Sequence, residues 1–224
     1  MSGAELPDGF PDCFEKLKSL FPSNHFTKER LQRLDEIYRA CESAWEFNLR
    51  ERIGGKTVKY LLIAEAPPWS EMGENINYFY INCAGQWVQR IWKAFFPTEK
   101  MPHREEALER LANCGFLLIV SLFFAERYTS AKRNTQKYKE LVKACSTTYF
   151  QEKINDGAIG WADEVKVALA FKLNGRAVIQ SFPNGLLLPT GQRIVLTEEV
   201  ICADPSGYTN SAQLRSAFGL HEHG

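Results

Sequence analysis

The sequence lacks the short-spaced motifs by which many cofactor sites are recognised. Its six cysteines are widely separated and none forms a Cys-x-x-Cys pair, whereas zinc and iron–sulfur sites normally show tighter spacing. There is also no glycine-rich dinucleotide fingerprint and no phosphate-binding P-loop. We therefore expect no metal and no cofactor, and we interpret the cysteines as buried free thiols in a reducing compartment.

Long apolar runs and an excess of either charge are missing as well. No stretch approaches the ~20 apolar residues of a membrane-spanning helix, and the first residues lack the basic start and apolar stretch of a signal peptide. The 27 Lys and Arg residues balance 27 Asp and Glu residues, which argues against strong non-specific attraction to nucleic acid but leaves a local basic face open. We expect a cytoplasmic protein without a membrane partner. The sequence does not determine the oligomeric state, for which a monomer is the expectation.

Apolar residues make up 45% of the 224 residues, enough to form a sizeable core. The apolar runs at 60–64 and 116–124, the second interrupted only by Ser121, are typical of strands covered on both faces, and 165–171 is a third predicted strand. A fourth strand is expected within 193–203, and segments with helical spacing separate the strands. This alternation predicts a three-layer α/β/α sandwich with a central, mostly parallel sheet of about four strands. We expect one domain over residues 1–224, with 1–55 as an N-terminal helical extension packed on it.

Capping residues predict where two of the helices begin. Thr27 precedes a long segment with helical spacing and has Glu29 in the favourable first turn. Asn210 precedes a short final segment, where its side chain can accept from the first amides of a helix. Both positions therefore serve as tests of the predicted boundaries.

Polar side chains follow three of the predicted strands, namely Glu65, Ser121 and Asp204. The carboxyl ends of parallel strands face one crevice, where open α/β sheets bind ligands. Pro67 and Pro68 fix two φ angles and supply no amide donors, so they predict a rigid loop behind Glu65. Two facing carboxylates indicate hydrolysis of a glycosidic bond, one activating water and the other handling the leaving group. The alternative is that each acid merely caps a helix or binds loop amides.

Four segments resemble parts of the uracil-DNA glycosylase superfamily, and one of them, Val165 to Ala177, resembles its third strand and the helix that follows. Ala64-Glu65-Ala66-Pro67-Pro68 resembles its first motif, closest to the branch that carries Gly-Glu-Ala/Gly-Pro-Gly. Asp204-Pro205-Ser206 resembles the last motif, usually His-Pro-Ser, and residues 80–85 resemble a segment that ends in Ala-Gly before a helix. The resemblance runs from about Lys59 to Asn210. It implies the fold of that superfamily, an activity on DNA that removes uracil or another damaged base, and a role in base excision repair.

The resemblance also implies a role for particular residues. Phe79 or Tyr80 would stack on a base turned out of the duplex, and Tyr208 would enter the duplex as an aromatic wedge. A basic stretch after the second strand would contact phosphates, although such a stretch is also typical of a solvated helix face. The implied catalytic residues are Glu65 and Asp204. The implied substrate-binding residues are Ala66, Pro67, Phe79, Tyr80 and Ser121. The implied DNA-binding residues are Pro68, Arg127, Lys132, Arg133, Ser206 and Tyr208.

The chain differs from the family pattern at two of these positions. Asp204 stands where a histidine usually faces the departing base, and Ser121 stands where an asparagine usually reads uracil. The differences favour a second hypothesis, a domain that binds DNA or a nucleotide without hydrolysis. A third hypothesis is an enzyme on free nucleosides or nucleotides with the same pocket chemistry. Phe79 and Tyr80 equally fit ordinary core packing.

Overall fold

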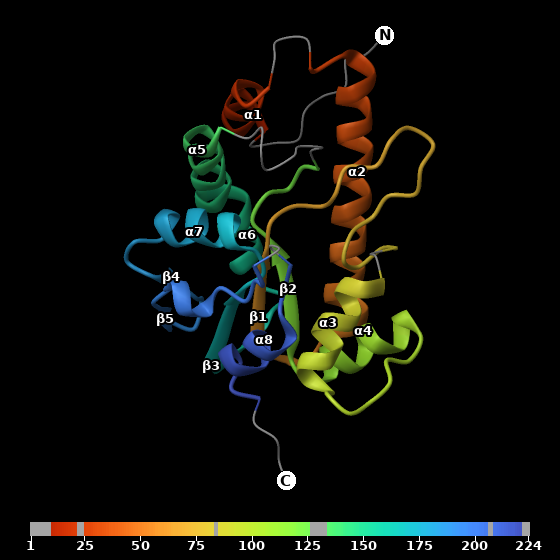
Figure 1. Ribbon diagram of the computed structural model, residues 1–224, viewed down its shortest axis with the longest axis vertical. Coiled ribbons are helices and arrows are strands. Elements are labelled where there is room, and N and C mark those ends of the chain that lie inside the picture. Colours follow the sequence, from red (N-terminus) through yellow and green to blue (C-terminus); the bar gives the residue numbers. More distant parts are fainter. Residues whose placement is uncertain (1–9, 22–24, 83–84, 126–133, 206–207, 221–224) are drawn as a thin grey trace.

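A parallel sheet lies between two groups of helices in the computed structural model, which describes residues 10–21, 25–82, 85–125, 134–205 and 208–220 (Figure 1). The expected α/β class is thereby confirmed. The three strands are β1 (Thr57–Ala64), β2 (Phe116–Val120) and β3 (Gly160–Leu169), in the order β2-β1-β3. Both pairings are parallel.

The central strand is β1, and its apolar run is buried on both faces, as its composition predicts. Ala64 lies opposite Val120 of β2, and Ile63 lies opposite Leu169 of β3. On one face, the ring of Tyr60 packs 5.4 Å from that of Phe95. This register brings the carboxyl ends of the three strands to one edge of the sheet.

The expected fourth strand is reduced to a single bridge in the described part of the chain. Strand β5 (Arg193–Ile194) pairs with β4 (Leu186–Leu187) in a separate antiparallel hairpin, and a 3₁₀ turn follows at Glu198–Val200. Only Ile201 then forms a parallel bridge to Leu169, beside a hydrogen bond of 2.8 Å from the Cys202 amide to the Leu169 carbonyl. The acidic 3₁₀ turn interrupts this segment with residues that disfavour strands, so the sheet has three full strands and a short edge contact.

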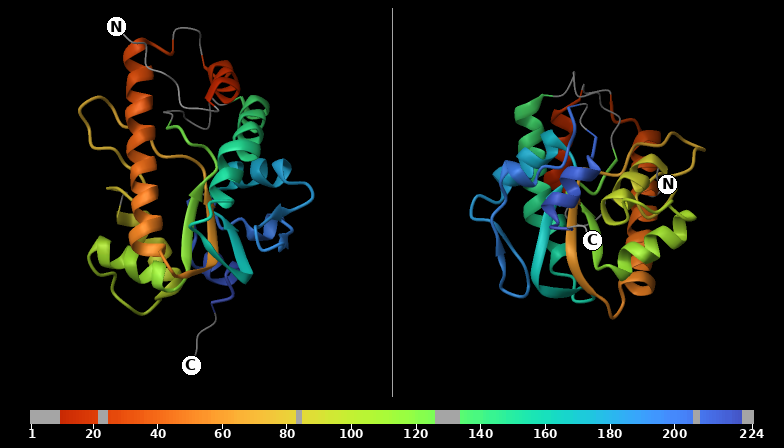
Figure 2. Two further views of the ribbon diagram at one scale, coloured as in Figure 1. Left: turned by 180° about the vertical axis from the view of Figure 1, so that it is seen from behind. Right: turned by 60° about the horizontal axis from the view of Figure 1, so that its bottom comes forward.

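Helices cover both faces of the sheet, and the view from behind shows the same separation (Figure 2). One group comprises α2 (Lys28–Phe47) with a π-helical end at Asn48–Ile53, α3 (Gly85–Phe95), α4 (Arg104–Asn113) and α8 (Ser211–Ala217). The other comprises α1 (Phe10–Ser19), α5 (Thr135–Cys145) with a π-helical end at Ser146–Phe150, α6 (Gln151–Ile154) and α7 (Lys172–Ser181).

Both predicted helix caps are confirmed. The Thr27 hydroxyl accepts from the Arg30 amide at 3.2 Å and begins α2. The Asn210 side-chain oxygen accepts from the Ala212 and Gln213 amides at 3.0 Å and begins α8. Local side-chain chemistry therefore determines these two boundaries.

Candidate functional site

Two adjacent strands end together at the upper edge of the sheet in Figure 1, β1 at Ala64 and β2 at Val120. Their pairing continues one step further. The Ser121 amide donates to the Ala64 carbonyl at 2.9 Å, and the Leu122 amide donates to the Glu65 carbonyl at 2.8 Å. Glu65 and Ser121 are therefore neighbours at the strand ends, where open parallel sheets bind ligands.

A pocket of about 350 Å³ opens at this edge. Small-molecule sites typically span roughly 300–1,000 Å³, so the pocket suits a small ligand. Its walls come from the loop after β1, the segment before α3, α3 itself and the end of β2. The lining residues are Ala66, Pro67, Pro68, Asn77, Tyr78, Phe79, Trp87 and Val120. Ala66, Pro67, Pro68 and Phe79, which the sequence singled out separately, thus meet at one place.

Aromatic side chains form one wall of this pocket. The rings of Phe79 and Trp87 lie 5.5 Å apart, and Trp87 lies 5.7 Å from Phe171 on its other side. Burial raises the pKa of Tyr78 well above its usual value, so its hydroxyl stays protonated. The wall is therefore apolar and uncharged, which suits a flat aromatic ligand.

Tyr80 serves the sheet rather than the pocket wall. Its hydroxyl donates to the Leu118 carbonyl and accepts from the Leu118 amide, both at 2.9 Å. Among the described residues β2 is an edge strand, so Tyr80 satisfies backbone groups that face no neighbouring strand there. Burial raises the pKa of Tyr80, although the hydrogen bond with Leu118 partly offsets this. Of the two aromatics expected to stack on a base, Phe79 is the one that lines the pocket.

The Glu65 side chain belongs to a polar network on the other side of the sheet. The Tyr138 hydroxyl of α5 donates to Glu65 Oε1 at 2.7 Å. Asn174 of α7 donates through Nδ2 to the Tyr138 hydroxyl at 3.2 Å and to Ser121 Oγ at 2.8 Å. The Ser121 hydroxyl donates to the Glu65 carbonyl at 3.2 Å. Ser121, expected to contact substrate, is thus bonded to Glu65 and Asn174.

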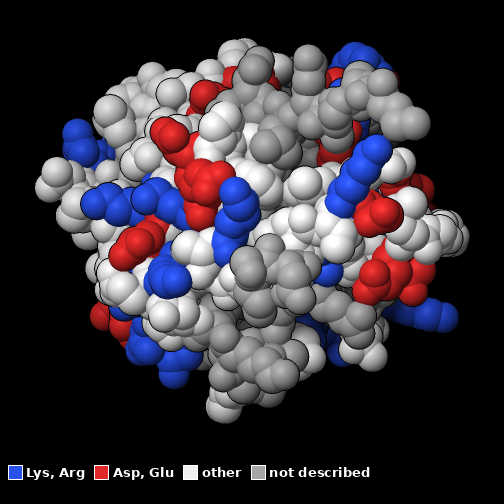
Figure 3. All heavy atoms as spheres, turned by 90° about the horizontal axis from the view of Figure 1, so that it is seen from above, with Lys and Arg blue, Asp and Glu red and all other residues white. Residues whose placement is uncertain are grey.

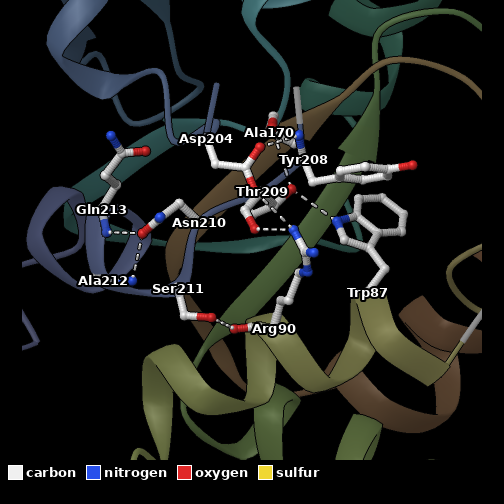
Figure 4. Close-up of polar contacts among 10 residues, drawn as sticks. All are labelled: Trp87, Arg90, Ala170, Asp204, Tyr208, Thr209, Asn210, Ser211, Ala212 and Gln213. Carbon is white, nitrogen blue, oxygen red and sulfur yellow. Dashed lines mark hydrogen bonds and ion pairs between the residues drawn. The ribbon is translucent and has the colours of Figure 1, made fainter. Parts of the chain in front are cut away.

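Asp204 organises the loop that follows the short edge contact of the sheet (Figure 4). Its Oδ1 accepts from the Tyr208 amide at 3.0 Å, and its own amide donates to the Tyr208 carbonyl at 2.7 Å. Its Oδ2 accepts from Arg90 of α3 at 3.4 Å. These are the loop-amide contacts that the sequence allowed as the alternative to catalysis. Asp204 thus contacts α3 whereas Glu65 contacts α5, and these helices cover opposite faces of the sheet, so the two carboxylates do not form the facing pair expected for glycosidic hydrolysis.

The same loop presents Tyr208 to solvent and is tied to the pocket wall. Tyr208 is 59% exposed, and the Arg90 guanidinium lies 5.0 Å from its ring centre. The Trp87 indole donates to the Thr209 hydroxyl at 2.9 Å, and that hydroxyl donates to the Ala170 carbonyl at 3.2 Å (Figure 4). Thr209 therefore joins the pocket wall, the end of β3 and the loop that carries Tyr208.

Helix α2 holds the loop that forms the pocket. Arg33 donates through Nε to the Ser70 carbonyl at 2.9 Å and through Nη2 to the Glu74 carbonyl at 2.8 Å. The Arg30 guanidinium lies 4.3 Å from the centre of the Trp69 ring. The segment expected to be an N-terminal extension thus contributes directly to the geometry of the pocket.

Four of the expected DNA contacts, Arg127, Lys132, Arg133 and Ser206, lie outside the described residues. The face seen from above, beyond the carboxyl ends of the strands, is drawn in Figure 3. Basic and acidic side chains are interspersed over its described part. The described charges on this face therefore do not form a surface of one sign.

Sequence reasoning missed several residues that build the site. Trp87 and Tyr138 occupy inner positions of helices, and their spacing indicated core packing. That spacing gives no sign of the hydrogen bonds made by the Trp87 indole and the Tyr138 hydroxyl. Asn174 lies within the first turn of α7, and its helical spacing to Ala177 and Val178 on the buried face was the signal that could have found it. Arg33 stands one turn before the buried Ile37, a spacing that places it on the inner face of α2.

Comparisons with known proteins found no match, whether with protein-family models, with curated proteins or with solved structures. Over the residues that the structure describes, no group of three or more His, Cys, Asp or Glu side chains is placed to hold a metal ion. No helix in that part of the chain combines the length and apolar character needed to cross a membrane. The site is therefore interpreted from its own geometry.

Proposed function

We propose that this chain is a uracil-DNA glycosylase-like protein that binds a flipped uracil or other damaged base and hydrolyses its N-glycosidic bond. One observation carries the proposal: an apolar pocket of about 350 Å³ lies at the carboxyl ends of two adjacent parallel strands, between a diproline loop and an aromatic wall. Enzymes that act on a base extrude it from the duplex into such a pocket.

The base enters between the Ala66–Pro67 backbone and the rings of Phe79 and Trp87, which replace part of the stacking lost on extrusion. As the bond to the sugar lengthens, positive charge develops on the sugar and negative charge on the base; water then adds to the anomeric carbon and loses a proton, and the released base takes up a proton. Glu65, one residue before the pocket-lining Ala66, stabilises the cationic sugar. Its contact with Tyr138 holds the carboxylate in one orientation.

Tyr208 fills the gap that the extruded base leaves. It is exposed on a loop that Asp204 closes and that Arg90 supports from α3. An aromatic wedge of this kind stabilises a kinked duplex by stacking on the neighbouring bases. The hydrogen bond from Trp87 of the pocket wall to Thr209 fixes the position of the neighbouring Tyr208 backbone relative to the pocket.

The test is release of bases from a panel of oligonucleotides that contain uracil, hypoxanthine, xanthine or other lesions. Abasic sites are detected by strand cleavage in alkali. We expect release from at least one lesion, its abolition by Glu65→Gln, and its abolition by Ala66→Leu, which fills the pocket. Glu42→Gln is the matched control, because Glu42 also accepts from a tyrosine hydroxyl, that of Tyr149 at 2.8 Å. The proposal fails if the wild-type protein releases no base from any substrate.

A second candidate function is binding without hydrolysis, in which the same pocket holds a base of DNA or a nucleotide. The engagement of Asp204 favours it, since both carboxylate oxygens accept hydrogen bonds from Tyr208 and Arg90. Ala66→Leu would then abolish binding, Glu65→Gln would leave affinity unchanged, and no lesion would be cleaved. Failure to bind DNA even at low salt would contradict both candidates.

A further inference from the structure

Glu65 is held by a closed ring of hydrogen bonds. The Tyr138 hydroxyl donates to the Glu65 carboxylate at 2.7 Å, and the Ser121 hydroxyl donates to the Glu65 main-chain carbonyl at 3.2 Å. Asn174 donates to both hydroxyl oxygens, at 3.2 Å to Tyr138 and at 2.8 Å to Ser121. One side-chain amide therefore contacts the hydroxyls of both Tyr138 and Ser121.

The Asn174 amide determines the direction of these hydrogen bonds. A hydroxyl has one proton, and an amide nitrogen only donates. Because both N–H groups of Asn174 point at the hydroxyl oxygens, the protons of Tyr138 and Ser121 are both directed at Glu65. The reverse amide orientation would draw both protons to Asn174 and leave two acceptor oxygens, those of Tyr138 and Glu65, 2.7 Å apart.

Asn174 keeps this orientation although its own oxygen is unsatisfied. The residue is 1% exposed, and its Oδ1 has no hydrogen-bond partner among the described residues. An unsatisfied buried acceptor is unfavourable, and such groups in folded proteins call for an explanation. Here the explanation is that this orientation lets both N–H groups of Asn174 donate to the hydroxyls of Tyr138 and Ser121.

We propose that Asn174 is a positioning residue for Glu65, acting through the hydroxyl protons of Tyr138 and Ser121. It fixes the carboxylate at the end of β1 in one orientation for the reaction. This inference rests on the proposed function for its kinetic consequence, but the directed hydrogen bonds exist whether or not the protein cleaves DNA.

The first experiment measures the Tyr138 hydroxyl proton by nuclear magnetic resonance in protein with labelled tyrosine, without any ligand. The signal is assigned by its loss in Tyr138→Phe. Asn174→Leu removes both donors without adding charge, and we expect the proton to exchange with water about tenfold faster or more, the factor typical of one hydrogen bond. In Asn174→Asp the proton turns to the new carboxylate, so its chemical shift changes. An unchanged exchange rate in Asn174→Leu together with an unchanged shift in Asn174→Asp overturns the inference.

The second experiment measures single-turnover base release and DNA affinity. We expect Asn174→Leu and Tyr138→Phe to slow release by roughly ten- to a hundredfold, since each weakens a hydrogen bond to a charged group. Affinity should stay within about twofold, because neither residue lines the pocket. In a Glu65→Gln background, Asn174→Leu should add little further loss.

Two outcomes separate this inference from the proposed function. If Asn174→Leu slows release equally with and without Glu65→Gln, Asn174 acts independently of Glu65 and the positioning role is wrong. If the wild-type protein releases no base, the proposed function fails while the exchange measurement still decides the hydrogen-bond geometry. Tyr149→Phe is the control in both experiments, because it removes a comparable tyrosine–glutamate hydrogen bond of 2.8 Å away from the site.

Discussion

Arg33 is the residue through which helix α2 holds the pocket loop, and we predict that Arg33→Met destabilises the protein. The side chain is 7% exposed and donates to two loop carbonyls, those of Ser70 and Glu74, at 2.9 and 2.8 Å. Methionine preserves the apolar stem of the side chain but supplies none of the donors. The substitution therefore isolates the contribution of the guanidinium.

The magnitude follows from these two hydrogen bonds. Hydrogen bonds to a charged group contribute about 1.5–3 kcal/mol each, so two of them contribute about 3–6 kcal/mol. Part of this is offset because the variant no longer buries a charge. The ion pair with Glu36 adds little, since Glu36 is partly exposed. We expect the free energy of unfolding to fall by about 2–4 kcal/mol, and the Tm by about 4–16 °C for a chain of this length.

The assay is urea denaturation combined with amide hydrogen exchange over residues 70–77. Arg39→Met is the matched control on the same helix, because the Arg39 side chain is 67% exposed and forms an ion pair with Asp35 at the surface. It should change the free energy of unfolding by less than about 1 kcal/mol. Equal losses in the two variants, or unchanged exchange in the loop of Arg33→Met, would refute the reasoning.

Two further predictions concern buried groups away from the pocket. Tyr80→Phe leaves the amide and carbonyl of Leu118 without their partner, so the free energy of unfolding in urea should fall by about 1–3 kcal/mol. Tyr60→Phe is the control, because the Tyr60 ring packs against Phe95 and Phe218. A similar fall in this control would contradict the prediction. The hydrogen bond from Cys145 lowers the pKa of Cys13 from 9.0 to about 7, although burial opposes the shift. The Cys13 thiolate therefore contributes stability that is fully present above pH 9 and is lost as the pH falls through 7. The stability difference between wild type and Cys13→Ala should therefore grow from about pH 6.5 to about pH 8.5 in urea titrations, and a difference independent of pH would contradict the prediction.

Much of the fold could be predicted because it depends on local signals. The apolar runs that became β1 and β2 carry no polar alternation, which is typical of short strands buried on both faces. The caps at Thr27 and Asn210 were predictable since a side-chain oxygen next to the first amides acts within three residues. The fourth strand was not predictable in the same way. Its length depends on whether Glu198–Val200 joins the sheet or turns outward, and that depends on tertiary contacts rather than on local residue types.

The backbone positions of the site residues could be predicted, but the hydrogen-bond partners of their side chains could not. Register and strand direction bring Glu65 beside Ser121, and both follow from the strands themselves. The partners of Glu65 come from α5 and α7, where Tyr138 and Asn174 occupy inner positions that helical spacing assigns to the core. Periodicity reports that a side chain is buried, but it does not report which polar atom at its tip meets which neighbour. The role of Arg33 was hidden for the same reason.

The extended backbone at Glu65 places the carboxylate and the pocket lining on different sides of the chain. Successive side chains of an extended chain point to opposite faces. Glu65 accordingly reaches Tyr138 of α5, while the next residue, Ala66, lines the pocket beside α3. A substitution at 65 therefore changes the carboxylate without altering the pocket, and one at 66 changes the pocket without altering the network. Inserting one residue between Ala64 and Glu65 would exchange the two faces. If the proposed function holds, DNA affinity and base release should then be lost together, whereas point substitutions should separate them.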